Sequence, residues 1–243
     1  MHTAARRAAV LVDAPARRSR ADDVYEQLKR DVSNFKLVPG DRFTETEISE
    51  RLGVSRTPVR QALFRLQQEG YVEVLFRSGW RVLPFDFDQF EQLYDLRMVL
   101  ETTAAQRLCA AGQGVNPELI EQLTAIWLVP VAGRSANAAR VAQWDEAFHC
   151  ALVAAAGNAE MARVHKDVTD RIRIIRRLDF TKPSRIDATY EEHAKILKAI
   201  QRKRGDQAAM LLRAHIASSQ AEVRKITLHQ VHLARQGGTP TVR

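Results

Sequence analysis

The N-terminal part of the chain places apolar residues at helical spacing in short blocks that turn residues separate. From Val24 to Phe35 an apolar side chain recurs every three or four positions, which predicts a helix over about residues 22–34 with one buried face. A short second helix, ending at Leu52, begins with the capping-box sequence that starts at Thr44. Gly53 then suits a left-handed helix end. The pattern therefore predicts two helices, the second of which ends in a tight turn.

A third helix begins directly after that turn. Ser55 is a suitable N-cap, and the helical pattern continues to the residue before Gly70. A short helix, a glycine turn and a longer helix predict a helix-turn-helix, whose second helix enters the DNA major groove by its N-terminal residues. Arg56 and Thr57 are those residues, and Arg60 lies one turn later on the same face. The shortage of acids nearby leaves these arginines for an anionic partner, although charge alone equally fits a solvated basic face.

Two short strand patterns come after the third helix. Tyr71–Phe76 and Arg77–Leu83 are typical of two short strands about a turn expected at Ser78–Gly79. This hairpin predicts a wing beside the helix-turn-helix. Arg77 and Arg81 are expected to flank its tip, where they would touch phosphate or a minor groove.

Beyond Pro84 the spacing is helical throughout, and strand signals are absent. Breaks rich in glycine or containing proline divide this part into six expected helices. Their expected bounds are Phe87–Ala111, Pro117–Leu128, Ala138–Ala155, Ala159–Leu178, Ile186–Arg202 and Gln207–Leu228. The fold class is therefore mainly α: an N-terminal winged helix-turn-helix followed by an antiparallel all-α helical bundle.

The amino-acid composition indicates the kind of binding partner but says little about the fold. The 243 residues are 45% hydrophobic and 27% charged, as in an ordinary globular protein, and the net charge of +8 favours a polyanionic partner. The two cysteines lie far apart, so no disulfide framework is expected and a reducing cytosol fits. No apolar run is long enough to span a bilayer. The arginine-rich first 20 residues predict a disordered basic arm, with a transit peptide as the open alternative.

Several polar residues fall on apolar helix faces in the C-terminal part. Asp145 and His149 lie four residues apart on one such face. His193 and His215 each lie among apolar neighbours on a later helix. A buried polar group without a partner costs on the order of 2 kcal/mol, and one shared divalent metal would satisfy all four side chains. The open alternative is a set of hydrogen-bonded core residues, since His165 also lies in phase with apolar neighbours.

The N-terminal motifs resemble the GntR family of bacterial transcription regulators. The resemblance covers about Val24 to Val82 and rests on a Pro-Gly before the second helix, the run Gly-Val-Ser-Arg-Thr-Pro-Val-Arg, and a glycine in the wing. With the wing arginines, the DNA-contacting residues that it implies are Arg56, Thr57, Arg60, Thr46, Gly79, Arg77 and Arg81. Two positions depart from the family: Gln61 replaces a usual Glu, and Thr46 replaces an Arg that contacts DNA in some members.

The C-terminal part resembles the FCD effector domain of the FadR subfamily over residues 87–230. The matching positions are Tyr94-Asp-Leu-Arg97, Glu101, Asp145, His149, Gly157-Asn158, Glu192-His193 and Ala214-His215. Metal-binding members imply that a divalent ion is held by Asp145, His149, His193 and His215. Zinc is the first expectation, with nickel, manganese and iron open. FadR itself binds acyl-CoA and lacks this set, so a fatty-acyl ligand is not expected.

The same resemblance implies a small organic acid beside the metal. Arg97 is the first candidate for holding its carboxylate, because a guanidinium can bind a carboxylate through two hydrogen bonds. Arg171 and Arg173 are weaker candidates, because the run that begins at Arg171 places arginines on several helix faces. The expected effector is a sugar acid, a hydroxy acid or a dicarboxylate.

These observations predict a cytoplasmic DNA-binding transcriptional regulator rather than an enzyme. We expect a homodimeric repressor of a double-stranded operator, with an activator as the open alternative. Two further alternatives stay open: a metal-dependent hydrolase or lyase fused to a DNA-binding module, and a regulator whose metal is structural and which has no effector. The expected segments are the basic arm (1–20), the winged helix-turn-helix (21–83), the effector and dimerisation domain (84–232) and a flexible tail (233–243).

Overall fold

The computed structural model describes residues 19–110 and 116–225. These residues form two compact units, one of residues 19–29 with 42–81 and one of residues 30–41 with the described part of 82–225. The expected basic arm up to residue 18, the predicted helix end at Ala111 and the tail from residue 226 lie outside the described residues.

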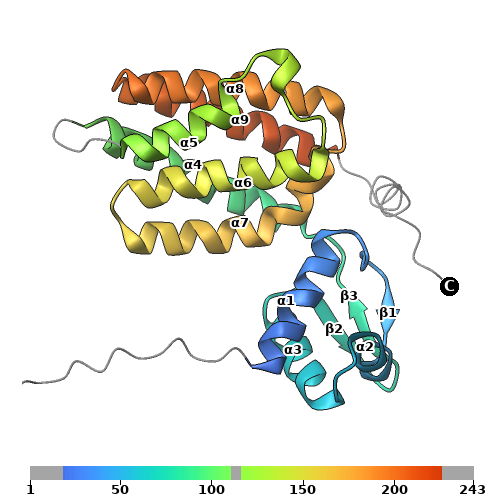
Figure 1. Ribbon diagram of the computed structural model, residues 1–243. Helices are drawn as coiled ribbons and strands as arrows, with labels where there is room; N and C mark the ends of the chain where they lie inside the picture. Colours follow the sequence, from blue (N-terminus) through green and yellow to red (C-terminus); the bar gives the residue numbers. More distant parts are fainter. Residues whose placement is uncertain (1–18, 111–115, 226–243) are drawn as a thin grey trace, which may run out of the picture. The chain divides into compact units, whose positions relative to one another are not determined.

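The first unit combines a helix-turn-helix with a small sheet (Figure 1). Its elements are α1 (Arg20–Ser33), whose last residues belong to the second unit, β1 (Arg42–Phe43), α2 (Glu45–Leu52), α3 (Arg56–Gln68), β2 (Val72–Leu75) and β3 (Gly79–Val82). α2 packs on α3, and α3 packs on β2. The apolar face of α3, with Val59, Leu63 and Leu66, is buried. The helix-turn-helix prediction is therefore confirmed.

Local capping sets the helix starts, as predicted. Thr44 and Glu47 form both hydrogen bonds of the capping box at α2, with the Thr44 amide donating to Glu47 Oε2 over 2.7 Å. Gly53 ends α2 in the left-handed region, with φ of 64°. Ser55 occupies the N-cap position of α3, but its side chain makes no capping hydrogen bond, so its contribution there is smaller than the sequence predicted.

The sheet differs from the prediction in two respects. Among the described residues it has three strands in the order β1-β3-β2, and β1 pairs antiparallel with β3 in the register Arg42 to Arg81. A two-residue strand carries too little alternation to stand out in a sequence, and the sequence pattern therefore did not predict β1. The turn falls over residues 76–78, and Gly79 is the first residue of β3, so the prediction of a turn at Ser78–Gly79 was wrong by about one residue. Arg77 supplies the left-handed conformation of the turn, with φ of 59°.

The second unit is helical apart from its connections. Its elements after the last residues of α1 are α4 (Phe87–Cys109), α5 (Pro117–Trp127), the short 3-10 helix η1 (Val131–Gly133), α6 (Ala138–Ala155), α7 (Ala159–Asp179), α8 (Pro183–Gln201) and α9 (Gly205–Val223). α6 has the predicted bounds. α8 begins three residues before the predicted start because proline is well tolerated in a first helical turn. α9 begins two residues before its predicted start and ends at Val223, short of the predicted end.

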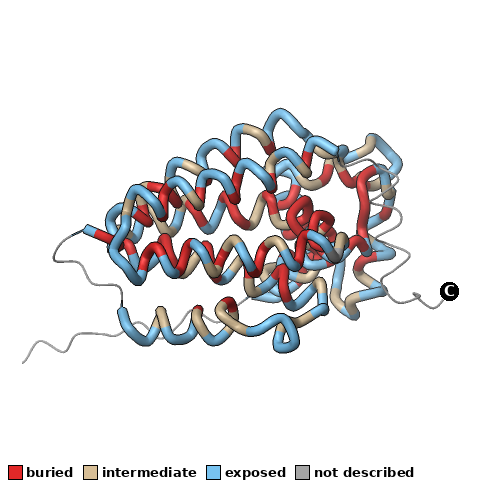
Figure 2. The backbone as a smooth tube through the Cα atoms, turned by 90° about the horizontal axis from the view of Figure 1, so that it is seen from above, coloured by how far each residue is buried: buried red, intermediate tan, exposed pale blue. Residues whose placement is uncertain are grey.

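α4 is the helix that most of the bundle packs against. It lies along α9 and also contacts α6, α7 and α8. Buried positions run along the inward faces of the long helices (Figure 2). The apolar core includes Leu108, Trp127, Phe148, Leu152, Tyr190, Ile196 and Leu212. Within the described ranges, none of the helices combines the length and the apolar character that a membrane span requires.

Two glycines in or next to the strands of the wing differ in the space that a side chain would find. Gly70 and Gly79 both have positive φ, 77° and 85°. A Cβ on Gly70 would meet nothing within 4 Å, whereas a Cβ on Gly79 would lie 2.5 Å from the carbonyl oxygen of Phe43. Gly70→Ala should therefore cost only the backbone strain of about 1–2 kcal/mol. Gly79→Ala should cost more, because β1 must also move away from β3.

Urea unfolding of the two variants measures this difference in the free energy of unfolding. Equal losses for Gly70→Ala and Gly79→Ala would contradict the close approach of β1 to β3.

Candidate metal centre and nucleic-acid interface

The first turn of α3 presents the arginines that the sequence singled out. Arg56, Thr57 and Arg60 are exposed and line a shallow hollow of about 520 Å³ with Gln61 and Phe64. Phe64 is half exposed and packs edge-on against Trp80 of β3, with ring centroids 5.6 Å apart. This contact fixes the wing against the outer face of α3.

An acid that the sequence analysis did not single out holds both arginines. Glu45, in the first turn of α2, accepts hydrogen bonds from Arg60 Nε over 2.9 Å and from Arg60 Nη2 over 2.8 Å. Arg56 Nη2 reaches the same carboxylate at 3.3 Å. The Arg60 hydrogen bonds lower the pKa of Glu45, so this carboxyl is ionised at neutral pH. The pairing depends on the tight turn after α2, and no sequence spacing signals it.

The other residues expected to contact DNA occupy different positions. Thr46 is exposed on α2, one residue beyond Glu45. Arg77 is exposed at the wing turn, with its guanidinium 5.0 Å from the ring centroid of Phe76. Arg81 lies within β3 rather than at the tip, and its Nε donates to Glu73 Oε1 over 2.7 Å. Arg77 is therefore the wing arginine available at the tip.

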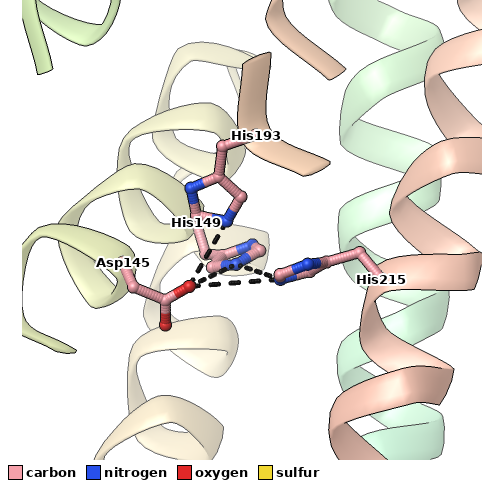
Figure 3. A group of neighbouring side chains, drawn as sticks. All are labelled: Asp145, His149, His193 and His215. Carbon is pink, nitrogen blue, oxygen red and sulfur yellow. Dashed lines mark hydrogen bonds and ion pairs between the residues drawn. The ribbon is translucent and has the colours of Figure 1, made fainter. Parts of the chain in front are cut away.

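Four inward polar side chains of the helical unit meet at one point (Figure 3). α6 supplies Asp145 and His149, α8 supplies His193, and α9 supplies His215. One potential ligand atom of each lies within 4.8 Å of all the others, and all four residues are buried. The structure therefore brings together the four residues that the sequence proposed as metal ligands.

The donor atoms of this cluster are spaced as ligands of one ion would be. Asp145 Oδ1 lies 3.3 Å from His193 Nε2, 3.5 Å from His149 Nε2 and 4.0 Å from His215 Nε2. His149 Nε2 and His215 Nε2 are 3.1 Å apart. Donors that share an ion at bond lengths of about 2.0–2.2 Å are separated by about 3–4 Å. The spacing fits a single metal ion.

Carboxylates behind two of the imidazoles fix which nitrogen faces the cluster. His149 Nδ1 donates to Glu101 Oε2 over 2.6 Å, and His215 Nδ1 donates to Glu192 Oε2 over 2.6 Å. The proton of each neutral ring therefore lies on Nδ1, and each Nε2 directs a lone pair at the cluster. Two such lone pairs 3.1 Å apart repel each other unless a cation lies between them. Carboxylate–histidine pairs of this kind orient metal ligands in proteins.

His193 is positioned by packing instead of hydrogen bonding. Its ring stacks on Phe148, with centroids 3.9 Å apart, and meets Trp127 edge-on at 4.2 Å. Among the described residues, neither ring nitrogen of His193 has a hydrogen-bond partner, and Asp145 Oδ1 has none either, whereas Asp145 Oδ2 forms an ion pair with Arg176. Buried polar atoms are rarely left in this state, so a ligand at the cluster would satisfy them.

The surroundings keep the imidazoles neutral. Burial lowers the pKa of His149, an effect that the Glu101 carboxylate opposes, and burial lowers the pKa values of His193 and His215 further. Neighbouring imidazoles and guanidiniums add to the shifts at His193 and His215. Burial alone would raise the pKa of Glu101, but Arg97 and His149 outweigh it and hold that pKa well below its usual value. Neutral imidazoles beside ionised carboxylates are the forms that bind metal.

Buried arginines lie around the cluster. One of them is a candidate that the sequence named, and Arg171, another candidate, lies elsewhere. Arg97 is fully buried, and its Nε donates to Glu101 Oε1 over 2.6 Å. Arg171 is only partly buried and lies 3.8 Å from Asp167, so the structure does not bring it to the cluster. Arg176 and Arg185 are the ones that reach it. Arg176 contacts Asp145, and Arg185 Nη1 lies 3.2 Å from Glu192.

His165 belongs to the layer behind the ligands. Its Nε2 lies 2.9 Å from Glu101 Oε1, so Glu101 joins His165, His149 and Arg97. His165 is not one of the four clustered donors. Its phase on α7 predicted that it points inward but could not separate a ligand from a supporting residue.

Two protein-family models match the chain. The model for "Bacterial regulatory proteins, gntR family" matches residues 20–82, and the model for the FCD domain matches residues 92–218. The Nta operon transcriptional regulator of Aminobacter aminovorans is 29% identical over 183 residues, which cover 75% of this chain and 84% of that protein. The HTH-type transcriptional repressor RspR of Escherichia coli is 23% identical over 203 residues, 84% of this chain and 88% of that protein.

Solved structures share the fold. Escherichia coli McbR/YncC aligns with a TM-score of 0.66 and 19% identity, covering 86% of this chain and 99% of that one. A GntR transcriptional regulator of Rhodococcus sp. RHA1 aligns with a TM-score of 0.70 at the same identity and coverage. The predicted fold class, a winged helix-turn-helix followed by an all-α domain, is confirmed.

The role of Glu101 behind His149 can be tested without touching a ligand. Glu101→Gln keeps the size of the side chain but removes the charge that orients His149, so the affinity for zinc should fall about 10- to 100-fold. Competition with a chromophoric chelator measures that affinity. Glu160→Gln is the matched control, because Glu160 is exposed and pairs with Arg163 at the surface. An unchanged zinc affinity in Glu101→Gln would contradict the supporting role.

Proposed function

The chain is a bacterial GntR-family transcriptional regulator with an FCD domain, and we propose that a small carboxylate held beside a divalent metal in the helical unit controls its affinity for an operator. The relatives of the chain are transcriptional regulators rather than enzymes, which disfavours the hydrolase or lyase alternative. The observation that carries the proposal is the buried cluster of three histidines and Asp145, with carboxylates behind two of the histidines.

We assign operator binding to α3 and the wing. The first turn of α3 exposes Arg56, Thr57 and Arg60, the position from which a recognition helix reaches base edges. Thr46, Gly79, Arg77 and Arg81 complete the proposed surface as residues that position the backbone of the DNA. Glu45 must release the two α3 arginines when they take DNA as their partner.

A homodimer is the proposed binding form. Helix-turn-helix proteins read operators with two-fold symmetry through paired recognition helices. The adjacent helices α4 and α9 carry exposed apolar side chains, Leu96 and Val99 on α4 and Met210 on α9, each at least 40% exposed. A second copy of the chain packed on this surface would bury them.

For the metal, zinc is the first choice. Three neutral imidazoles and one carboxylate suit zinc, with nickel, manganese and iron as further candidates, and solvent or an acid would complete the coordination. Arg97 is the proposed carboxylate partner: it is buried, and its two terminal nitrogens have no hydrogen-bond partner among the described residues. A purely structural metal would leave these donors without a role. Arg171 remains a proposed effector contact only if the bundle rearranges, because its guanidinium lies beside Asp167.

Control of DNA binding requires linkage between the two sites. An effector changes operator affinity only if it binds unequally to the arrangements that can and cannot bind DNA. We propose relief of repression as the sign of this control, in line with the RspR relative, which is named a repressor. The effector classes proposed are sugar acids, hydroxy acids and dicarboxylates.

The proposed role of α3 in operator recognition predicts how much DNA affinity is lost when one of its arginines is replaced. Arg56→Ala should weaken binding to a duplex selected from a random library by about 1–3 kcal/mol and relax the preference at the bases it reads. Fluorescence anisotropy against selected and scrambled duplexes measures both effects. Arg163→Ala is the control, because Arg163 is an exposed arginine of α7 paired with Glu160. A loss that is equal on both duplexes would show a contact to phosphate alone.

Metal-dependent acid binding predicts a second result. In a thermal-shift screen against sugar acids, hydroxy acids and dicarboxylates, one class should raise the melting temperature of the zinc-loaded protein, since ligands of the native state stabilise it. Chelation should abolish that shift, and so should His193→Ala, which should lose zinc and still bind DNA. Retained zinc in His193→Ala would contradict the ligand set. Zinc stabilisation without any acid response would favour the structural metal.

A further inference from the structure

The turn of the wing carries the most exposed large apolar side chain of the described residues. Phe76 follows β2 directly, and it is 84% exposed. Exposure rises toward this turn at alternate positions, from 1% at Val72 to 53% at Val74 and then to the value at Phe76. Alternate residues of a strand share one face, so the apolar stripe of β2 continues beyond the core to the tip of the wing. An apolar stripe that ends in solvent among charged neighbours is typical of an interaction surface.

Phe76 differs in its surroundings from Phe64, the exposed phenylalanine of α3. Phe64 packs edge-on against Trp80, with ring centroids 5.6 Å apart. Among the described residues, no aromatic ring packs against Phe76, and the contact of its ring is the guanidinium of Arg77, 5.0 Å from the ring centroid. A guanidinium over an aromatic face is attracted to it. This pair holds a positive charge and an apolar ring together at the tip of the wing.

The wing around Phe76 is basic. Arg42 of β1 and Arg77 of the turn are exposed, and neither forms an ion pair with any described residue. Arg81 of β3 pairs with Glu73 of β2, so the acid of the hairpin is already neutralised. The wing therefore offers positive charge beside an apolar ring. Nucleic acid matches both, because phosphates line its surface and apolar base faces lie stacked between them.

The attachment of the wing to α3 also favours DNA as the partner. β2 packs on α3, and Trp80 of β3 contacts Phe64 of α3. The wing is therefore held against the helix that presents Arg56 and Arg60. When a recognition helix lies in a major groove, an adjoining segment of the protein can reach the neighbouring minor groove. A wing held in this way is placed for such a contact.

We propose that Phe76 is a wedge that enters the minor groove of the operator and partly unstacks one base step, while Arg77 beside it neutralises a neighbouring phosphate. The proposal rests on the proposed function for its DNA partner, and it is independent of the metal and of the effector. Proteins that bind the minor groove insert Phe, Leu, Ile, Met or Pro between base steps, and the resulting kink lets more protein surface meet the DNA. Phe76 supplies such a side chain at the exposed tip of the wing.

A wedge gives the operator a sequence preference that does not come from hydrogen bonds to bases. The cost of a kink depends on the base step, and the pyrimidine–purine steps TA and CA/TG kink most easily. The wing therefore selects such a step without reading a base edge. A contact from Arg77 to phosphate carries no sequence information by itself, so a base-step preference separates the wedge from a purely electrostatic wing.

The test uses the full-length protein and a duplex that the wild type selects from a random library, labelled at both ends so that energy transfer reports bending. Phe76→Ala should bind this duplex about tenfold more weakly or worse and bend it less, while the salt dependence keeps its slope because no phosphate contact is lost. Phe76→Leu should recover part of both, since leucine also serves as a wedge. Arg77→Ala should instead reduce the salt slope by about one. Val131→Ala is the matched control, because Val131 is a 73% exposed apolar residue of the helical unit, and it should bind as the wild type does.

A second set of duplexes locates the step that the ring enters. Each pyrimidine–purine step of the selected site is replaced in turn by a stiffer step. At one of them the replacement should weaken the wild type about fivefold or more and leave Phe76→Ala unchanged. Such non-additivity between a DNA change and a protein change is the mark of a direct interaction.

Melting curves and light scattering for every variant separate a loss of the wedge from a loss of the fold or of the oligomer. Phe76→Ala with the affinity and bending of the wild type would overturn the wedge. A loss that is equal on selected and scrambled duplexes, with a lower salt slope, would assign the residue to a phosphate contact instead. A changed oligomeric state with unchanged bending would assign the ring to a contact between copies of the chain. In these three cases operator binding by the wild type stands, whereas a wild type that selects no duplex would overturn operator binding and the wedge together.

Discussion

One carboxylate, that of Glu101, joins three helices inside the bundle. It accepts from Arg97 on its own helix α4, from His149 on α6 and from His165 on α7. Each of these groups would be expensive to bury alone, and the shared Glu101 carboxylate offsets part of that cost. The packing of α4 against α6 and α7 is thus tied to the orientation of a metal-ligand candidate. A change in this network would alter helix packing and the metal cluster together.

The bundle therefore serves two purposes with the same residues. Apolar side chains such as Trp127 and Phe148 form the core, and they also hold the His193 ring by stacking. His149 and His215 are held by hydrogen bonds instead. Because the ligands are supported in different ways, the geometry of the cluster depends both on the apolar core and on the buried charges.

The sequence predicted those features of the structure that depend on interactions between residues close together in the chain. The capping box at Thr44 and the left-handed Gly53 act within a few residues, and both appear in the structure as expected. Helical phase alone placed His149, His193 and His215 inward. Contacts between elements that are distant in the sequence could not be predicted. The pairing of Glu45 with Arg60 depends on the geometry of the turn between α2 and α3. The strand β1 forms only because β3 lies beside it. Arg176 and Arg171 are five residues apart on α7, and only the packing direction of that helix decides which of the two meets Asp145.

The pairing of Glu45 with the α3 arginines also bears on conformational entropy. An exposed arginine that becomes fixed on binding loses rotamer freedom worth about 0.5–1.5 kcal/mol. Arg60 has given up much of that freedom on folding, because two hydrogen bonds to Glu45 already select its side-chain conformation. Any anion that takes the place of Glu45 meets a guanidinium that is already ordered. The entropic cost of the encounter is then carried by the folding of the helix-turn-helix and is largely absent from the binding step.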